Sequence, residues 1–374
     1  MSAGLKYIDE FRDPERIECL LDRIKKRITG DWTIMEVCGG QTHAIIRHGL
    51  DRILPDGINI VHGPGCPVCI VPPHVIDNAV TIAEDKKVIL CTFGDMLRVP
   101  GTNTDFLKAR ASGCDIRAVY SPLDALQVAL DETDREVVFL AIGFETTAPA
   151  NALAVARAQS MRVKNFTLLT AQALIPPLVE TILRDPGNVI QGLLAPGHVC
   201  TVDGYQEYEM LTARYNIPIV VTGFEPYDLM DGIYHLVTLL EKGENVVVNS
   251  YARAVKREGN LSAKKIVKEY FEIGEGSWRG LGRIPRSGLH LREKYGHFNA
   301  EKKFQVNTGP VEETSGCRSA EVLRGKIKPE DCPLFGAECT PENPFGAPMV
   351  SSEGVCAAYY KYRRLNHGKA DIDG

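Results

Sequence analysis

The chain has 374 residues, of which 44% are hydrophobic and 24% charged, and its formal net charge is −5. This composition is typical of a globular protein, and the length predicts two or three domains. A negative net charge excludes a general attraction to nucleic acid or anionic membranes. No apolar run reaches the roughly 20 residues of a membrane helix, and the N-terminus lacks the apolar core of a signal peptide. We therefore expect a cytoplasmic protein.

The cysteine content is the unusual part of the composition. Eleven cysteines is an odd number and a small fraction of the chain, which argues against a secreted disulfide scaffold. Clustered cysteines in a reducing compartment point instead to metal binding or redox chemistry. One pair has Cys-x-x-Cys spacing (Cys66 and Cys69), and four more crowd the C-terminal part of the chain (Cys317, Cys332, Cys339 and Cys356).

Strand and helix patterns alternate through the first part of the chain. A charged helix is predicted over 8–29, because its apolar residues recur at helical spacing. Short apolar runs bounded by turn residues then predict strands, each followed by a helical pattern. The strands are expected at 32–37, in the run that ends at His62, at 87–92 and at 116–120, and the helices at 42–48, at 74–84, up to Ser112 and at 123–131.

The alternation continues to about residue 250 and then stops. Beyond it, a charged helix at 263–271 precedes a glycine-rich stretch at 274–282 with little periodicity. The tail at 309–356 is rich in Pro, Gly and Cys, and such a segment needs a staple, such as a metal centre, to fold. The strands of this second part are predicted at 136–142, 166–169, 189–194 and 218–222.

Strands that alternate with helices at this spacing predict parallel sheets covered on both faces. We therefore predict the α/β fold class, with two tandem parallel-sheet (Rossmann-like) domains and a Cys-rich C-terminal iron–sulfur domain. The predicted divisions are an N-terminal helix at 1–30, α/β domains at 31–134 and 135–250, and an iron–sulfur cluster domain at 251–374.

The residues that follow the predicted strands are the site candidates, because ligands of parallel sheets bind beyond the carboxyl ends of the strands. Glu145 and Glu225 are candidate general acids or bases, or polar groups that satisfy helix N-termini, and the residues alone favour the second role. Asp95 and His198 call for the same reservation. The full set is Cys38, Cys66, Asp95, Glu145, His198 and Glu225.

Cys66 and Cys69 lie between a predicted strand and a predicted helix. A helix N-terminus stabilises a thiolate, and the short spacing allows a disulfide to close. The prolines and glycines around the pair predict a fixed, exposed loop, so redox or metal chemistry is favoured over a buried structural pair.

Cys38 lies in a strand-to-helix turn before Gly39 and Gly40, which allow another group to approach the backbone closely. His43 lies one helical turn further along and is a candidate base or ligand. The residues alone leave a catalytic and a structural role for Cys38 evenly balanced.

The four C-terminal cysteines have the spacing C-x14-C-x6-C-x16-C. Four thiolates suit tetrahedral zinc or an iron–sulfur cluster. The tight C-x2–4-C knuckles of zinc sites are absent from this set, so the wide spacing favours a cluster. The chain also lacks the P-loop and dinucleotide-binding motifs, and the C-x3-C-x2-C signature of radical-SAM enzymes.

Taken together, several motifs resemble the HypD family of [NiFe]-hydrogenase maturation proteins, and the resemblance covers nearly the whole chain. The motifs are CGGQTHAI at 38–45, GPGCPVC at 63–69, FGDMLRVPG at 93–101, GFETTAP at 143–149, APGHV at 195–199, GFEP at 223–226 and the four late cysteines.

The resemblance implies a redox-active assembly scaffold for an Fe(CN)2CO unit, rather than a conventional turnover enzyme. It implies the small chaperone HypC, the cyanide donor HypE (charged by HypF) and the hydrogenase large-subunit precursor as partners. Cys38 would bind iron together with a cysteine of HypC, with His43 in the same turn and Glu145 kept as a catalytic candidate. Cys66 and Cys69 would form a redox-active dithiol, and a [4Fe–4S] cluster would be held by Cys317, Cys332, Cys339 and Cys356.

Two other functions stay open at this point. One is a stand-alone thiol–disulfide oxidoreductase that resembles ferredoxin:thioredoxin reductase and needs Cys66 and Cys69 but not Cys38. The other is a zinc-stapled binding module without electron transfer, against which the wide cysteine spacing counts.

Overall fold

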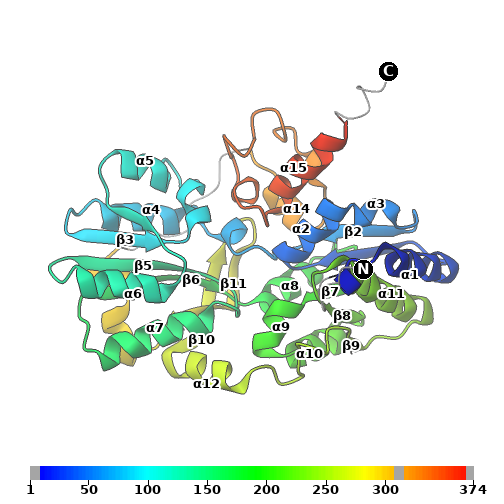
Figure 1. Ribbon diagram of the computed structural model, residues 1–374, viewed down its shortest axis with the longest axis horizontal. Helices are drawn as coiled ribbons and strands as arrows, with labels where there is room; N and C mark the ends of the chain where they lie inside the picture. The colour runs from blue at the N-terminus through cyan, green and yellow to red at the C-terminus, as the bar shows by residue number, and fades with distance from the viewer. Residues whose placement is uncertain (1–8, 307–315, 368–374) are drawn as a thin grey trace, which may run out of the picture.

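The computed structural model describes residues 9–306 and 316–367, and its two β-sheets lie side by side with a C-terminal segment above their junction (Figure 1). Sheet A is entirely parallel, with the strand order β2-β1-β7-β8-β9. Its strands are β1 (Trp32–Glu36), β2 (Ile58–His62), β7 (Gly192–Pro196), β8 (Ile219–Thr222) and β9 (Val247–Asn249).

Sheet B has the order β10-β11-β6-β5-β3-β4, and its last four strands are parallel. The hairpin β10–β11 joins the edge of β6 antiparallel. The strands are β3 (Val88–Thr92), β4 (Ile116–Ala118), β5 (Glu136–Gly143), β6 (Phe166–Ala173), β10 (Phe271–Trp278) and β11 (Gly282–Leu291). The predicted α/β class with two parallel-containing sheets is confirmed.

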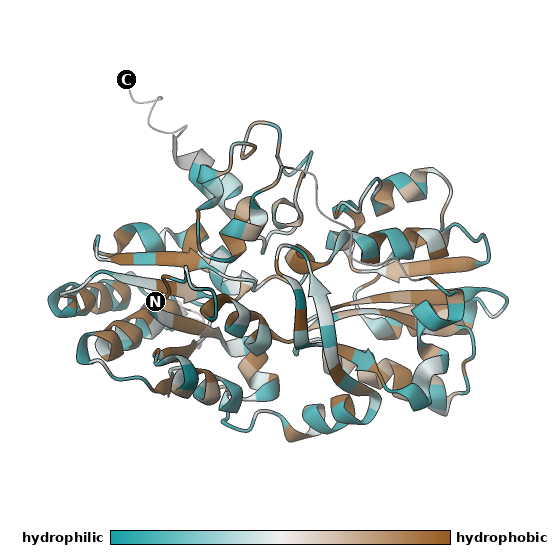
Figure 2. Cartoon of the chain, turned by 180° about the vertical axis from the view of Figure 1, so that it is seen from behind, coloured by the Kyte–Doolittle hydropathy of each residue, from teal (hydrophilic) through white to brown (hydrophobic). Residues whose placement is uncertain are grey.

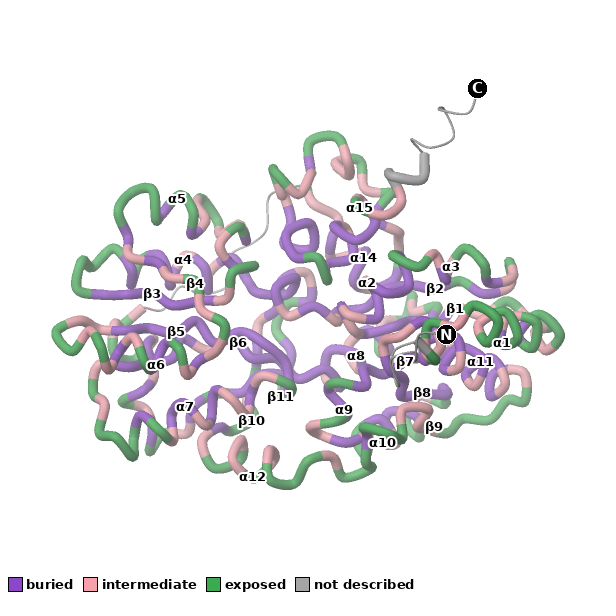
Figure 3. Tube along the Cα trace, in the orientation of Figure 1, coloured by how far each residue is buried: buried purple, intermediate pink, exposed green. Residues whose placement is uncertain are grey.

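Helices cover both faces of the sheets, so the strands are apolar and buried while the outer helix faces are polar and exposed (Figures 2 and 3). Their ends carry ordinary signals, such as the capping box of Ser121 and Asp124 and the left-handed Gly243 after α11. The helices are α1 (Pro14–Arg27), α2 (Gly39–His48), α3 (Leu50–Ile53), α4 (Pro73–Ala83), α5 (Phe106–Ala111), α6 (Pro122–Asp131), α7 (Ala148–Ser160), α8 (Ile175–Leu183), α9 (Gly197–Asp203), α10 (Gln206–Tyr215), α11 (Pro226–Lys242), α12 (Leu261–Tyr270), α13 (Ala300–Phe304), α14 (Ser319–Leu323) and α15 (Val355–His367). Among the described residues, no helix combines the length and apolarity needed to cross a membrane.

The predicted boundary at residue 134 does not separate the two sheets. The chain leaves sheet A after β2, builds β3 to β6 in sheet B, and returns to sheet A for β7 to β9. Each sheet is therefore made of segments that are far apart in the sequence. Hydrophobic periodicity identifies strands and their order along the chain, but it carries no information about which sheet each strand joins.

The glycine-rich stretch with little periodicity nevertheless forms regular structure, because it contains the second half of β10, the turn and the first residue of β11. A Cβ atom on Gly274 would lie 2.6 Å from the His290 ring, and one on Gly276 would lie 2.5 Å from the Trp278 ring. The glycines therefore make room for rings that cross the hairpin, which hides the strand pattern. The hairpin belongs to sheet B and not to a separate C-terminal unit that begins at residue 251.

Both sheets have a point where the strand order reverses, between β1 and β7 in sheet A and between β3 and β5 in sheet B. Ligands of open parallel sheets bind outside the carboxyl ends of the strands at such a point. Cys38 follows β1, and Asp95 follows β3. The first connection between the sheets, from β2 to α4, contains Cys66 and Cys69.

The carboxylate of Glu241 joins the end of α11 to the loop before β1. It accepts hydrogen bonds from the backbone N–H of Thr29 at 2.8 Å and of Gly30 at 3.1 Å, and from Trp32 Nε1 at 2.7 Å. Desolvation opposes ionisation here, but these hydrogen bonds outweigh it and lower the pKa of Glu241 from 4.5 to about 2.

This depressed pKa makes a prediction about acid stability. The stabilisation by Glu241 is complete above its ordinary pKa of 4.5 and is lost as the pH falls towards about 2. In Glu241→Gln, the unfolding free energy should therefore decrease less steeply below about pH 5 than in the native chain. Urea denaturation at several pH values measures this, with Glu244→Gln as the control. Parallel profiles for Glu241→Gln and the native chain would contradict it.

Candidate functional site

Cys38 is the N-cap residue of α2 and lies two residues after the end of β1. The turn that precedes the Cys-x-x-Cys pair lies against it, because Gly39 N–H donates to Gly65 O at 2.8 Å. A Cβ atom on Gly65 would lie 2.2 Å from Cys38 N. Two motifs of the sequence, CGGQ and GPGC, thus meet backbone to backbone, and only glycine at position 65 permits this contact.

The buried carboxylate of Glu36 holds the Cys38 turn in place. Glu36 is 0% exposed, and its Oε2 accepts the Cys38 N–H at 2.9 Å. Its Oε1 accepts the Thr42 hydroxyl and lies 2.6 Å from His62 Nδ1. His62 Nε2 lies 3.1 Å from the Tyr359 hydroxyl of α15. The turn is therefore tied to the C-terminal helix through three buried side chains.

Burial raises the pKa of the Cys38 thiol to about 12, although N–H groups of Gln41 and Gly40 oppose the shift. The carboxylates of Glu36 and Glu353 raise it further. The thiol is therefore neutral at pH 7 without a metal. A metal cation that replaces this proton would bind a sulfur at the N-terminus of α2, where the helix dipole stabilises the negative charge of a thiolate.

The Cys38 cleft, as we call the cavity of about 470 Å³ at this turn, is lined from three parts of the molecule. Sheet A supplies Cys38 and His198, the β5–α7 turn of sheet B supplies Thr146 and Thr147, and the C-terminal segment supplies Glu353. His198 stacks on Phe224 at 3.6 Å between ring centroids, and burial lowers the pKa of its imidazole. Two of the predicted strand-end residues, Cys38 and His198, are thus brought together.

The Cys66–Cys69 loop is buried, so the prediction of an exposed loop was wrong. Cys66 is 4% exposed and Cys69 is 0% exposed, and the Cys69 N–H donates to Cys66 O at 3.1 Å within the 3-10 turn η2 (Val68–Ile70). Burial, then a hydrogen bond with the Cys66 thiol, raises the pKa of Cys69. In this reduced form the loop does not stabilise a thiolate, because desolvation outweighs the field of the nearby helix.

The hairpin of sheet B fixes this loop from one side. The buried Arg279 accounts for the contact, since its Nε donates to Val71 O at 2.8 Å and its backbone N–H to Ile70 O at 2.8 Å. On the other side η2 contacts η6 (Ala347–Met349) of the C-terminal segment. The Cys356 sulfur is close enough to contribute to the raised pKa of Cys69.

The four C-terminal cysteines line one small cavity, together with apolar residues such as Leu334 and Met349. Cys339 is buried and the other three are half-buried. Burial raises the pKa of Cys356, and the sulfurs of Cys317, Cys339 and Cys332 add to the shift. Thiols that are far apart in the sequence therefore converge, as their wide spacing requires for a shared site.

The donor set of this cavity is four cysteine sulfurs, which can hold either tetrahedral zinc or an iron–sulfur cluster. A Cβ atom on Gly346 would lie 2.5 Å from Cys317 Sγ, so glycine leaves that sulfur room. Cys356 lies in the first turn of α15, whose N-terminus favours negative charge. Four thiolates around an apolar space suit an iron–sulfur cluster.

The FGDMLRVPG motif holds the C-terminal segment in place. The Ser351 hydroxyl donates to Asp95 Oδ2 at 2.6 Å, and Arg98 Nη1 donates to Pro341 O at 2.8 Å. His43 also contacts the C-terminal segment, because its Nδ1 lies 2.8 Å from Ser352 O and its Nε2 lies 3.3 Å from the Tyr362 hydroxyl. In this structure, His43 and Asp95 thus bond to the C-terminal segment, and neither lines the Cys38 cleft.

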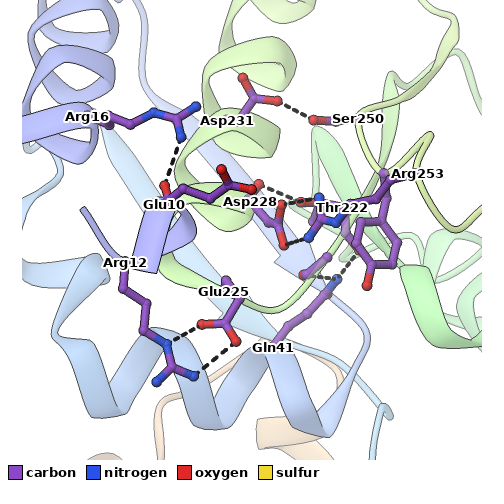
Figure 4. Close-up of polar contacts among 12 residues, drawn as sticks. Glu10, Arg12, Arg16, Gln41, Thr222, Glu225, Asp228, Asp231, Ser250 and Arg253 are labelled. Atoms are coloured by element: carbon purple, nitrogen blue, oxygen red, sulfur yellow. Dashed lines mark hydrogen bonds and ion pairs between the residues drawn. The ribbon is translucent and has the colours of Figure 1, made fainter. Parts of the chain in front are cut away.

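Two predicted acidic residues also lie outside the Cys38 cleft. Glu225 forms a two-point ion pair with Arg12, at 2.6 and 3.0 Å (Figure 4). Glu145 accepts the N–H of Ile175, the first residue of α8, at 2.8 Å and lines a different cavity. For Glu145, the alternative of satisfying a helix N-terminus describes the observed contact.

Sequence reasoning missed Glu36, His62 and Glu353. Glu36 and His62 are the last residues of buried strands, where a charged side chain in an apolar run is a usable signal. Gln41 was passed over as well, yet its Nε2 donates to Ala195 O and Thr222 O, each at 3.2 Å, and so joins α2 to the ends of β7 and β8 (Figure 4). Glu353 offers no comparable signal apart from its nearness to Cys356.

Comparison with known proteins identifies the family. The family model described as "HypD: Hydrogenase formation hypA family" matches residues 15–363. The chain belongs to the HypD family. It is 44% identical to the hydrogenase maturation factor HypD of Escherichia coli K12 over 368 residues, which cover 96% of this chain and 99% of that protein. It is 45% identical to HypD2 of Bradyrhizobium diazoefficiens (371 residues, 96% and 98%) and to HypD of Cupriavidus necator (375 residues, 96% and 98%).

For this HypD-family chain, Gly65 offers a direct test of the site geometry. Gly65→Ala should lower the unfolding free energy by about 3 kcal/mol, the upper end of overpacking costs, and displace the Cys38 turn. Gly94→Ala is the matched control, because its Cβ atom would have no neighbour within 4 Å. Chemical denaturation measures the first effect, and the alkylation rate of Cys38 by mass spectrometry the second. Equal stability and equal rates in the two variants would contradict the described contact.

Proposed function

We propose that this protein is a redox-active scaffold on which an Fe(CN)2CO unit is assembled for [NiFe]-hydrogenase. The observation that carries the proposal is the convergence of three cysteine groups. Cys38 opens into a cleft, the Cys66–Cys69 pair lies in the loop whose first part touches the Cys38 turn, and the four-cysteine cavity adjoins that pair. The relatives are named hydrogenase maturation factors, which supports the same role.

Cys38 is the residue that we propose binds the iron substrate. Thiolate is a soft, electron-rich ligand and suits iron that carries cyanide and CO. The thiol gives up its proton when iron binds, and the N–H groups of Gly40 and Gln41 then stabilise the sulfur charge. Glu36 keeps the turn in place during this exchange through its bond with the Cys38 N–H. A cysteine of a HypC-type partner would supply a second ligand from the open side of the cleft.

Cys66 and Cys69 are proposed to supply electrons for cyanide transfer. Release of cyanide as CN⁻ from a thiocyanate on a HypE-type partner breaks a sulfur–carbon bond and needs two electrons. Closure of the Cys66–Cys69 dithiol to a disulfide provides two electrons and releases two protons, and the cyanide then binds to iron. Reopening the disulfide takes two electrons and two protons, and a [4Fe–4S] cluster held by the four late cysteines would pass the electrons on one at a time from an external one-electron reductant.

The proposed partners follow from this scheme and from the family. A HypC-type chaperone, HypE charged by HypF, and the hydrogenase large-subunit precursor would act in turn, and no nucleic acid is involved. A stand-alone oxidoreductase needs Cys66 and Cys69 but not Cys38, so the Cys38→Ala variant separates it from the scaffold. Cys66 and Cys69 are 4% and 0% exposed, so either function needs a change of conformation at this loop before a partner's sulfur reaches them.

The first test of the scaffold is Cys38→Ala. Hydrogenase maturation in cells that depend on this protein should be abolished, because the iron substrate loses its ligand, while the late cysteines keep their metal content. Cys19→Ala is the matched control, since Cys19 is exposed on α1 and should leave maturation unchanged. Normal maturation by the Cys38→Ala protein would refute the proposal.

The second test addresses the four-cysteine cavity by metal analysis of anaerobically purified protein. About four irons with matching acid-labile sulfide per chain are expected, as for a [4Fe–4S] cluster. Cys332→Ala should lower both together, whereas Cys114→Ala, at a buried cysteine in the loop before β4, should lower neither. One zinc per chain without sulfide would instead make the cavity a structural staple and remove the electron source.

A further inference from the structure

A second large cavity, of about 620 Å³, lies next to the Cys38 cleft. It is bounded by α10, α12 and hairpin β10–β11, and its size suits a small organic molecule. Apolar side chains such as Leu174, Phe271 and Leu289 form much of its wall, and Val199 lines both this cavity and the Cys38 cleft. Glu145 of the GFETTAP motif, which the proposed iron chemistry does not use, lines it too.

Two buried side chains in the wall carry oxygen atoms without a hydrogen-bond partner among the described residues. Glu145 is 3% exposed and its Oε2 is unpaired, and Tyr208 is 1% exposed and its hydroxyl is unpaired. A buried unsatisfied polar group costs about 1–3 kcal/mol. Native proteins keep few such groups, and each calls for an explanation. A ligand that donates hydrogen bonds is one explanation that covers both residues.

Three carboxyl groups form what we call the acidic wall of this cavity: Glu145, Asp203 and Glu207. Within residues 9–306 and 316–367, the ion pairs involve none of them. Burial raises the pKa of Glu145, and the nearby Asp203 raises it further. Burial followed by the effect of Asp203 raises the pKa of Glu207 in the same way. Among the described residues, the carboxyl groups of the acidic wall therefore form no ion pair with a basic side chain.

The basic residues of the cavity make other contacts and do not pair with the carboxyl groups of the acidic wall. The Lys264 amine donates to the main-chain oxygens of Asp203 and Glu258, at 2.9 and 3.3 Å. Arg292 donates to Lys268 O at 2.9 Å and lies 3.7 Å from Glu272. Lys268 and Arg286 are exposed. Lys264 lowers the pKa of Asp203, and Lys264 and Arg286 lower that of Glu207, but burial outweighs them at both groups.

We propose that this cavity binds a small organic cation, in which a primary ammonium or guanidinium group is carried on a short apolar chain. The cationic nitrogen donates hydrogen bonds to Glu145 and Tyr208 and restores the charge of the acidic wall. The apolar chain lies against Leu174, Phe271 and Leu289. The proposal is independent of the iron chemistry, because no cysteine of that chemistry lines this cavity.

Three ligands of equal length and different charge test the proposal on the full chain. Butylamine, butanol and butyrate are titrated by ligand-observed NMR. Butylamine should bind at least about ten-fold more tightly than the other two, because it alone forms charge-assisted hydrogen bonds with the acidic wall. Its affinity should rise with pH, since the raised pKa of Glu145 keeps that group protonated at lower pH, while the amine stays charged up to about pH 10.

Substitutions locate the site. Glu145→Gln keeps an oxygen for the Ile175 N–H but removes the charge, and it should weaken butylamine binding about ten-fold. Tyr208→Phe should weaken it as well. Glu209→Gln is the control on the same helix, because Glu209 pairs with Arg257 outside the cavity and should leave binding unchanged.

Several results would overturn the proposal: no butylamine binding at tens of millimolar, equal binding of all three ligands, or tighter binding of butyrate. Equal butylamine affinity in native, Glu145→Gln and Tyr208→Phe proteins would do so too. None of these outcomes bears on hydrogenase maturation, so this proposal and the proposed scaffold function can fail separately.

Discussion

The buried carboxylate of Glu36 is the interaction on which the site geometry depends. A carboxylate at 0% exposure is stable only when it is paired and hydrogen-bonded. Here it accepts hydrogen bonds from the Cys38 N–H and the Thr42 hydroxyl and bonds to the His62 ring. The other nitrogen of His62 lies within hydrogen-bond distance of the Tyr359 hydroxyl. The end of β1, the end of β2, the start of α2 and the C-terminal helix are therefore held together by one charge. Removal of any one partner leaves a buried polar group unsatisfied.

The arrangement of the chain explains how the three cysteine groups meet. Two parallel sheets each end in a strand-order reversal, and the chain passes from one sheet to the other through the Cys66–Cys69 loop. The C-terminal segment rests on both sheets, since Ser351 bonds to Asp95 after β3 while His43 of α2 contacts Ser352 and Tyr362 (Figure 1). Each group of cysteines is positioned by contacts with the parts of the chain that carry the others.

Burial affects the metal-free thiol and the metal-bound thiolate in opposite ways. It raises the pKa of Cys38 and Cys69, so the metal-free thiols keep their protons and resist adventitious oxidation. The same burial strengthens the attraction between a thiolate and a bound cation once the proton has left. Under the proposed function, the open space next to Cys38, in a cleft of about 470 Å³, would admit the iron substrate and its partner.

Much of the fold and part of the site could be predicted from the residues. Apolar runs ending at Val37, His62 and Thr92 predicted β1, β2 and β3, since period and turn residues are local properties. The convergence of late cysteines could be expected from their spacing. The hairpin could not, because its glycines are explained only by the rings of Trp278 and His290 that cross it.

What the sequence determined by itself is therefore local: the α/β alternation, the positions of most parallel strands, and the chemical nature of the cysteines. Tertiary structure decided which sheet each strand joins, that the Cys66–Cys69 loop is buried under Arg279, and that Glu145 points to a second cavity while its neighbour Thr146 lines the Cys38 cleft. Pairing and burial depend on contacts between residues far apart in the chain, and hydrophobic periodicity carries no record of those contacts.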